Sequence, residues 1–247
     1  DRQNPFRETW STLVVPASPD VNPAPPPKSG TVWTVLENGP ATEKVDLLVL
    51  GEGYAGKDLP KFHADVKRMV DTLFRYEPFK SRKADFNVRA LDLPSGEGGA
   101  HRPQSGIFRR TPLQVQYNVF GSERYVLTYD DRALRDAAAQ APYDVVEVLV
   151  NDAQYGGGGI YNHQATASAD TGFAEYVFVH EFGHHFAALA DEYYTSDVAY
   201  ETGASDLPEP WEPNVTALKD PARLKWKELV EAGTPLPTPW SKEAFEK

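Results

Sequence analysis

Three residues in the second half of the chain have the types and the spacing of a metal site. His180 and His184 are four residues apart, and Glu181 follows the first of them, in the sequence HEFGH. Residues i and i+4 of a helix lie about 40° apart around its axis, so both imidazole rings can reach one metal ion. Glu181 lies beside that position and can accept a proton from a water molecule there. The pattern predicts one catalytic Zn²⁺, with His180 and His184 as ligands and Glu181 as the general base.

The acidic and aromatic residues that follow are candidates to complete this site. A catalytic zinc site has a third protein ligand, for which Asp191 is our first choice and Glu192 our second. On an unbroken helix Asp191 would lie about 10 Å further along the axis than His184, so the helix must end and the chain must turn back. In the alternative, both carboxylates simply begin a solvent-exposed loop. Tyr193 or Tyr194 can donate a hydrogen bond to the oxyanion of a tetrahedral intermediate.

Composition and charge restrict the class of protein. The chain has 247 residues, of which 40% are hydrophobic and 25% charged, as is typical of a globular protein with a sizeable core. Lys and Arg total 25 against 36 for Asp and Glu, and the net charge of -11 disfavours nucleic acid or an anionic membrane as a partner. No apolar run approaches the roughly 18 residues that a membrane span needs. The lack of cysteine excludes disulfides, thiol nucleophiles and Cys-ligated zinc.

The chain divides into a proline-rich segment and one folded domain. Residues 1–30 contain a short apolar run, STLVV at 11–15, which we expect to form a strand. Prolines then stand at 16, 19, 23, 25, 26 and 27, a density that favours polyproline II geometry in a linker or in an ordered arm. Residues 31–247 are expected to form a single domain.

From Thr31 onward, strand and helix patterns alternate. Strands are predicted at 31–37, 45–50, 86–93 and 143–151, and helices at 58–79, 129–142 and 220–233. The βαβ order of 45–93 predicts parallel strands, and 94–125 are expected to be irregular. Asp170 or Thr171 can cap the helix that carries HExxH. The result is an α+β domain with a mixed, mostly parallel, twisted sheet of about five strands backed by two long helices.

A second motif favours a different class of protein. Gly51, Gly53 and Gly56 form the pattern GxGxxG directly after a buried strand and before a helix, as in a dinucleotide-binding turn. The corresponding hypothesis is an NAD- or FAD-dependent oxidoreductase. Its acidic partner would be Asp92, which lies about twice the usual ~20 residues from the glycines. The next strand leads to HExxH and not to another βα unit, so this hypothesis is the weaker one.

Longer segments around HExxH carry a resemblance to a known family. They are HEFGHHFAALADEYY, LVNDAQYGGGGIYN and LLVLGEGY, together with EPFKSRKADFNVRA, RYVLTYDD and PWEPNVTALKDPARLKWKELVEAGTPLPTPW. Together these segments resemble the IgA-peptidase-like family of bacterial zinc metallopeptidases, also designated M64. The resemblance runs from about Val45 to Lys247 and is far more specific than HExxH alone.

This resemblance implies a zincin fold of metzincin type and a zinc-dependent endopeptidase acting on a protein or peptide substrate. His180 and His184 match the zinc ligands, Glu181 the general base, and Asp191 the acidic position that completes the site. Family members are usually secreted or extracytoplasmic, and some cleave immunoglobulin. They often follow a small N-terminal β domain, of which residues 1–30 would be a remnant.

By the same analogy, IYNHQATA (160–167) is the edge strand beside the cleft, where an extended substrate can add as another strand. The glycines before it would let the substrate backbone approach closely, or would form a flexible loop. We therefore expect Gly158, Gly159, Ile160 and Tyr161 to contact the substrate.

Two departures from the family pattern bear on activity. Where the resemblance leads us to expect HSFAGLADEY, the chain has HHFAALADEY, so Ala188 replaces a glycine at the helix end. Glycine adopts left-handed geometry more easily than alanine, which bears on the turn towards Asp191. The only methionine is Met69, upstream of the motif, so the Met-containing turn of metzincins is expected to be lost or to lie beyond the end of this sequence. His185 points about 100° away from His184 and is expected behind the site or at the surface.

One more hypothesis is a non-catalytic binding module on a zincin scaffold. The intact His180, Glu181 and His184 argue against it, because a retired site has no need of a general base. The sequence specifies neither the substrate protein nor the oligomeric state.

Overall fold

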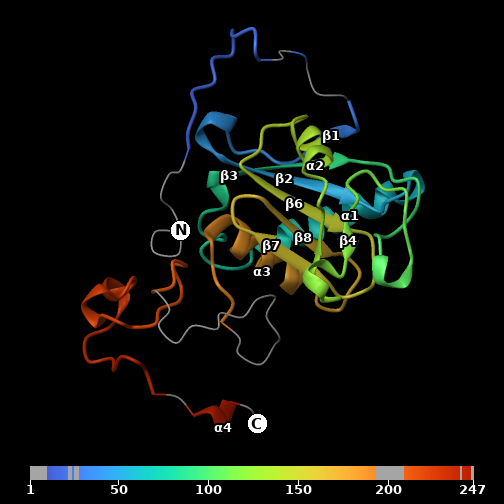
Figure 1. Ribbon diagram of the computed structural model, residues 1–247. Coiled ribbons are helices and arrows are strands. Elements are labelled where there is room, and N and C mark those ends of the chain that lie inside the picture. The colour runs from blue at the N-terminus through green and yellow to red at the C-terminus, as the bar shows by residue number, and fades with distance from the viewer. Residues whose placement is uncertain (1–9, 22–23, 25–27, 193–208, 240, 246–247) are drawn as a thin grey trace. The chain divides into compact units, whose positions relative to one another are not determined.

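A computed structural model of the chain describes residues 10–21, 24, 28–192, 209–239 and 241–245. The chain forms two compact units. One is Val14–Ala188, and the other contains the described residues of Leu189–Lys247 and of the first 13 residues. The first unit contains the sheet and the long helices (Figure 1). Within the described ranges, no helix has the length and apolar character that crossing a membrane requires.

The core of the first unit is a six-stranded sheet with the order β1-β3-β2-β6-β8-β7 (Figure 1). Its strands are β1 Thr31–Leu36, β2 Val45–Glu52, β3 Phe86–Asp92, β6 Val145–Val150, β7 Gly157–Ile160 and β8 Gln164–Ser168. The four central strands are mutually parallel, and the edge strands β1 and β7 run antiparallel to their neighbours. The predicted mixed, mostly parallel sheet is confirmed, with six strands instead of about five.

The central strands β2 and β6 are buried on both faces, and most of their side chains are apolar. Every residue of β6 is buried, and β2 is buried from Asp46 onward. Asp46 is tolerated there because the Arg89 guanidinium on β3 pairs with it and Asn87 Nδ2 donates a hydrogen bond to it over 3.1 Å. These partners replace the hydrogen bonds to water that the Asp46 carboxylate loses on burial, and so reduce the cost of burying its charge.

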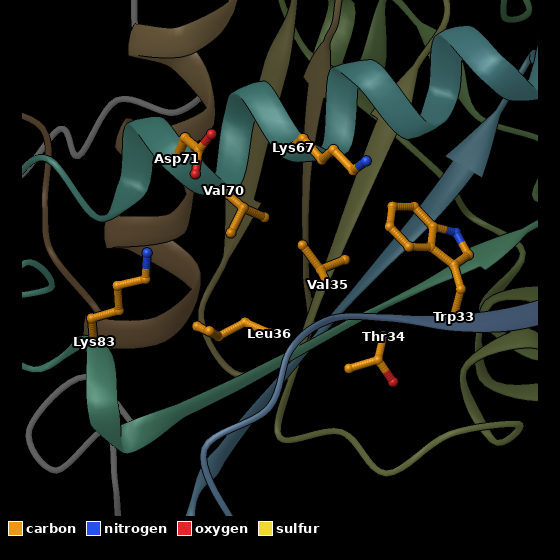
Figure 2. A pocket seen from close by; sticks show the side chains of 8 residues that line it. All are labelled: Trp33, Thr34, Val35, Leu36, Lys67, Val70, Asp71 and Lys83. Atoms are coloured by element: carbon orange, nitrogen blue, oxygen red, sulfur yellow. The ribbon is translucent and has the colours of Figure 1, made fainter.

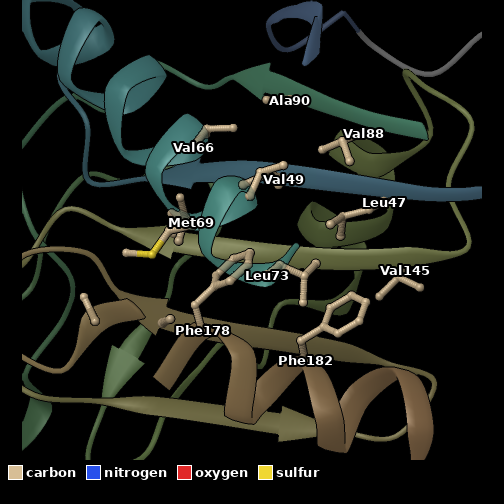
Figure 3. Packing of buried hydrophobic residues seen from close by; sticks show 14 of the residues in the cluster. Leu47, Val49, Val66, Met69, Leu73, Val88, Ala90, Val145, Phe178 and Phe182 are labelled. Atoms are coloured by element: carbon tan, nitrogen blue, oxygen red, sulfur yellow. The ribbon is translucent and has the colours of Figure 1, made fainter. Parts of the chain in front are cut away.

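Two long helices cover one face of the sheet. They are α1 Leu59–Leu73 and α3 Ala174–Ala187, as the periodicity predicted, although α1 ends six residues before the predicted boundary at 79. Their apolar side chains meet the sheet in one continuous core, shown in Figure 3, whose labelled members are Leu47, Val49, Val66, Met69, Leu73, Val88, Ala90, Val145, Phe178 and Phe182. The shorter α2, Asp131–Ala138, packs on the opposite face through Leu134, Ala137 and Ala138.

Polar contacts tie the two long helices together near the start of α3. Thr72 Oγ1 on α1 donates to Glu175 Oε2 on α3 over 3.0 Å. Arg68 on α1 donates to the carbonyl of Ala169, five residues before α3, over 2.7 Å, and its neighbour Asp65 on the same helix accepts from it over 3.0 Å. These bonds fix the entry of the chain into the helix that carries HExxH.

The segment 94–125 is largely irregular, as predicted, but buried polar bonds hold it. It contributes β4 Gln116–Tyr117, which pairs with β5 Val126–Leu127 in a two-stranded ribbon. Glu52, at the end of β2, accepts hydrogen bonds from the backbone N–H groups of Leu113 and Val115 over 3.0 and 2.9 Å. Burial raises the pKa of the Glu52 carboxyl to about 7, because the charged form loses its hydration.

Two sequence-based predictions of secondary structure are wrong. Residues 11–15 form no strand, and Leu13 and Val14 are exposed, because apolar alternation alone does not supply a partner strand. The predicted helix 220–233 consists of two 3-10 turns, Pro221–Arg223 and Lys227–Leu229, separated by the non-helical residues 224–226. A longer helix needs a packed apolar face, whereas Leu229 is 84% exposed. The remaining helices are 3-10 turns at Ala41–Glu43, Gly56–Asp58, Lys83–Asp85, Pro103–Ser105 and Val119–Gly121, and α4 Lys242–Phe245.

Candidate metal centre and active site

The helix that carries HExxH begins after a turn made by Thr171. The Thr171 carbonyl accepts from Ala174 N over 3.1 Å, and Thr171 Oγ1 accepts from Phe173 N over 3.2 Å. Phe173 occupies the N-cap position, where no side-chain cap bond forms. The prediction that Asp170 or Thr171 is the N-cap is therefore wrong by two or three residues, although Thr171 does shape the turn.

His180, Glu181 and His184 come together on α3. The Nε2 atoms of the two histidines are 3.1 Å apart, and their rings lie nearly perpendicular, with centroids separated by 4.6 Å. One ligand atom from each of the three residues lies within 4.8 Å of the others, and all three side chains are half-buried. The ring of the exposed Tyr176 stacks on His180 at 5.6 Å. The predicted spatial grouping of these three residues is present.

The donor set of this cluster suits a transition-metal ion such as zinc. Two nitrogen ligands, each 2.0–2.1 Å from a tetrahedral zinc ion, are separated by roughly 3.3 Å. The observed separation of 3.1 Å between the two Nε2 atoms is close to that value. Imidazole nitrogens with a nearby carboxylate are ligands that zinc prefers.

The four glycines 156–159 do not form a flexible loop. Gly157, Gly158 and Gly159 are the first three residues of β7, the edge strand of the sheet. A Cβ atom on Gly157 would lie 2.5 Å from Val177 Cγ1 and 2.8 Å from Glu181 Oε1. A Cβ atom on Gly159 would lie 2.6 Å from the Glu181 carbonyl and 2.8 Å from His184 Cβ. These glycines therefore let the helix with the candidate site lie directly against the edge strand.

The other two glycines pack against the opposite side of the strand. A Cβ atom on Gly156 would lie 2.3 Å from Val126, and one on Gly158 would lie 2.9 Å from Leu127, both in β5. The prediction that IYNHQATA is the edge strand is wrong in its bounds. Only Ile160 belongs to that strand, because the chain turns at 161–163 and continues as β8, one position further into the sheet.

A buried carboxyl that the sequence analysis overlooked lies beneath the site. Glu147 is in the middle of β6 and is fully buried. Burial and, secondly, the charge of Glu181 raise the pKa of Glu147 well above its usual range. Within the described part of the chain, neither of its carboxylate oxygens has a hydrogen-bond partner. The available signal was a single acidic residue in the otherwise apolar run VVEVLV.

His185 lies behind the His180–Glu181–His184 cluster and is buried, which is one of the two places that we expected. Its Nδ1 lies 3.1 Å from the carbonyl oxygen of Ile160, and its Nε2 lies 3.3 Å from the backbone N–H of Val146. A carbonyl only accepts and an amide only donates, so Nδ1 carries the proton and Nε2 is the acceptor. Burial, aided by nearby His163 and Arg135, lowers the pKa of His185 to about 4, and the ring is neutral at pH 7.

The helix ends where the third-ligand hypothesis requires. α3 stops at Ala187, and Ala188 takes the left-handed conformation, with φ 58° and ψ 31°. The N–H of Ala188 donates to the carbonyl of His184 over 3.1 Å. The geometry expected of the family's glycine is thus adopted by an alanine.

In the second unit, the Asn214 side chain forms hydrogen bonds with the residues on both sides of Asp191, Ala190 and Glu192. Its side chain accepts from Ala190 N over 2.8 Å and donates to Ala190 O over 2.8 Å and to Glu192 Oε1 over 2.9 Å. Glu192 is exposed and Asp191 is half-buried. The contact between residues 24 positions apart could not be seen in the sequence, and Asn214 was missed. Tyr193 and Tyr194 lie outside the described residues.

The alternative GxGxxG motif forms a different kind of turn. The N–H of Gly53 donates to Ser95 Oγ over 2.9 Å, and the Gly53 carbonyl accepts from Gly99 N over 3.3 Å. In a dinucleotide-binding turn the Gly53 N–H would bind the phosphate, but here it is already bonded to Ser95. Asp92, the proposed acidic partner, accepts instead from Trp33 Nε1 over 3.0 Å and contacts His63 Nε2 at 2.8 Å. These contacts disfavour the dinucleotide hypothesis.

A pocket of about 270 Å³ opens between β1 and α1 (Figure 2). Its lining residues are Trp33, Thr34, Val35, Leu36, Lys67, Val70, Asp71 and Lys83. None of them belongs to α3 or β7, so this pocket is not part of the histidine cluster.

A mixed, mostly parallel sheet, with a His–Glu–His cluster on a helix packed against its edge strand, fits a peptidase domain. The comparison with protein families identifies the group. The family model of IgA Peptidase M64 matches residues 34–247, and the chain belongs to this family. No curated protein matches the sequence significantly. The chain is therefore a member of a peptidase family, as its resemblance implied.

Proposed function

We propose that the protein is a zinc-dependent endopeptidase. The observation that carries this proposal is the 3.1 Å separation of His180 Nε2 and His184 Nε2, with the Glu181 carboxylate in the same cluster. Membership of a metallopeptidase family supports it, because such enzymes usually use zinc.

His180, His184 and Asp191 would hold the ion. Asp191 is preferred to Glu192 because it matches the acidic position that the family resemblance places in the site. The left-handed Ala188 ends α3 three residues before Asp191 and allows the chain to leave the helix axis.

When bound, zinc would supply a Lewis acid that polarises the scissile carbonyl and lowers the pKa of its water ligand towards about 7. Glu181 would then accept a proton from the attacking water and pass it to the leaving amine nitrogen. The carboxylate oxygens of Glu181 lie close to Gly157 and Gly159 of β7, so this strand limits the positions that they can take. Burial and the charge of Glu181 raise the pKa of Glu147, which favours its neutral form and so reduces the negative charge beneath Glu181.

The substrate would be an extended protein or peptide segment that adds to the outer edge of β7. Gly156 O accepts from Ser168 N, so alternate residues of β7 turn their backbone groups towards β8. Gly157 and Gly159 face the other way, and Gly157 N already donates to Arg124 O over 3.0 Å. Gly159 is then the first residue whose N–H and C=O can pair with substrate, with Gly158, Ile160 and Tyr161 beside it.

Immunoglobulin is one candidate substrate, proposed from the family alone, and a secreted or extracytoplasmic location is proposed on the same ground. The binding-module hypothesis is retained only as an outcome of the experiment that follows.

The test compares wild-type protein with Glu181→Gln on immunoglobulin A and on unfolded casein, with zinc content measured in parallel. The proposal predicts cleavage that a chelator abolishes, and a loss of at least about 100-fold in the variant with zinc retained. Glu175→Gln is the control, because Glu175 contacts α1 at the other end of the same helix. Full activity of Glu181→Gln contradicts the mechanism. Zinc binding without cleavage of either protein supports the binding-module hypothesis.

A further inference from the structure

His185 makes three hydrogen bonds that connect the last turn of α3 to two other elements. Its ring contacts Val146 on β6 and Ile160 at the end of β7. Its own backbone carbonyl accepts from the N–H of Asn162, in the turn between β7 and β8, over 3.0 Å. The side chain is 3% exposed, so these bonds are protected from water.

The bond to Val146 replaces a missing part of the sheet. Val150 O accepts from Ala169 N, so Val150, Val148 and Val146 all turn their backbone groups towards β8. The pairing of β6 with β8 begins only at Glu147 and Ala165. The N–H of Val146 therefore points to a place where β8 has not yet started, and His185 Nε2 accepts its hydrogen bond there.

The bond to Ile160 fixes the end of the edge strand. Ile160 O also accepts from His163 N over 3.0 Å, which closes the turn 160–163. Asn162 in this turn has a positive φ of 54°, a left-handed conformation that asparagine adopts more readily than most residues. The ring and the backbone carbonyl of His185 hold the turn at both Ile160 and Asn162.

We propose that His185 is a positioning residue for the candidate active site. Its covalent neighbour His184 is a proposed ligand, and Ile160 ends the strand proposed to bind substrate. The His185 ring links the end of α3 and the end of β7 to β6. It therefore determines how His184 is positioned and oriented relative to the edge strand. This inference rests on the proposed zinc site only for its functional consequence, since the hydrogen bonds exist independently of it.

The test uses His185→Leu, which removes the donor and the acceptor, and His185→Gln, whose amide supplies one of each. Val66→Ala in the α1 core is the control for lost stability alone. Two quantities are measured below the melting range of every variant. They are the affinity for zinc, by competition with a chromophoric chelator, and the hydrogen-exchange rates of the Val146 and Asn162 amides.

We expect His185→Leu to weaken zinc binding by tenfold or more and to expose both amides. We expect His185→Gln to restore most of both properties, and Val66→Ala to change neither. Zinc affinity and amide protection that are unchanged in His185→Leu would overturn the inference. If wild-type protein bound no zinc, the proposed function would fail, and the exchange rates would still decide whether His185 holds the two elements.

Discussion

Gly159 of the edge strand lies directly against His184 of α3, so close that a Cβ atom on the glycine would be 2.8 Å from the Cβ of the histidine. The same atom would be 2.6 Å from the carbonyl oxygen of Glu181. No ordinary side chain fits between the helix and the strand at this point. The position of the candidate metal cluster therefore depends on a residue without a side chain.

The first prediction concerns this contact. Gly159→Ala must push α3 away from β7, and we expect it to lower the free energy of unfolding by about 1–3 kcal/mol and the peptidase activity by more than tenfold. Urea unfolding and cleavage of casein measure the two effects. Gly172→Ala, at a glycine with nothing within 4 Å of the added atom, is the control and should behave as wild type. Equal effects of the two substitutions would contradict the close approach.

The second prediction concerns the end of α3. Ala188 holds a left-handed conformation that costs an alanine about 1–2 kcal/mol, and glycine avoids this cost. After the loss of chain entropy is subtracted, Ala188→Gly should stabilise the protein by up to about 1 kcal/mol, or a few degrees in melting temperature. Ala187→Gly, at the last helical residue, should destabilise it by a similar amount. Equal destabilisation by Ala188→Gly and Ala187→Gly would contradict the left-handed conformation of Ala188.

The third prediction concerns pH. The pKa of Glu52 is about 7 in the folded protein, against a usual value of 4.5, because the carboxyl is buried. The folded state therefore keeps a proton that the unfolded state has lost, and this stabilisation is full below pH 4.5 and declines as the pH rises towards 7. The loss amounts to about 3 kcal/mol at most.

Urea unfolding between pH 4 and 8, on protein from which metal has been removed with a chelator, tests this prediction. Wild type should lose stability steadily as the pH rises through the pKa of Glu52, and Glu52→Gln should show a shallower slope because it cannot titrate. The slopes are compared instead of the absolute stabilities. Leu113 N and Val115 N bind different oxygens of Glu52, and in Glu52→Gln one of these oxygens is replaced by an NH2 group that cannot accept. Identical slopes would show that Glu52 is not the titrating group.

The fourth prediction concerns Asn214 and the choice of third ligand. Asn214→Ala removes the bonds to Ala190 and Glu192 and should weaken zinc binding by about tenfold or more, because Asp191 loses its support. Glu192→Gln retains an acceptor for Asn214 and should leave zinc affinity unchanged. The affinities are measured by chelator competition. Loss of zinc in Glu192→Gln, with retention in Asn214→Ala, would assign Glu192 as the ligand.

The sequence predicts the strands β1, β2, β3 and β6 much better than the β7 edge of the sheet. The strands β2, β3 and β6 and the helices α1 and α3 follow from apolar runs and helical spacing, since burial on one or two faces leaves a direct pattern. β7 was not predicted as a strand, because three of its four residues are glycines and carry no side-chain pattern. The approach of α3 that requires these glycines is visible only in three dimensions.

The candidate site shows the same division. His180, Glu181 and His184 come from one turn of one helix, so their spacing alone predicts that they meet. Glu147, Asn214 and the contacts of His185 depend on elements far apart in the chain, and no local pattern marks them. The stretch 220–233 looked helical by the same local rules, and without a surface to pack against it forms only two short turns.

The most direct test of the central claim is the zinc content of protein purified without a chelator, measured by plasma mass spectrometry. The proposed site predicts about one zinc ion per chain in wild type and almost none in His184→Ala, with the fold of both checked by circular dichroism. Wild-type protein without zinc, or His184→Ala with as much zinc as wild type, would contradict the assignment of His180 and His184 as ligands.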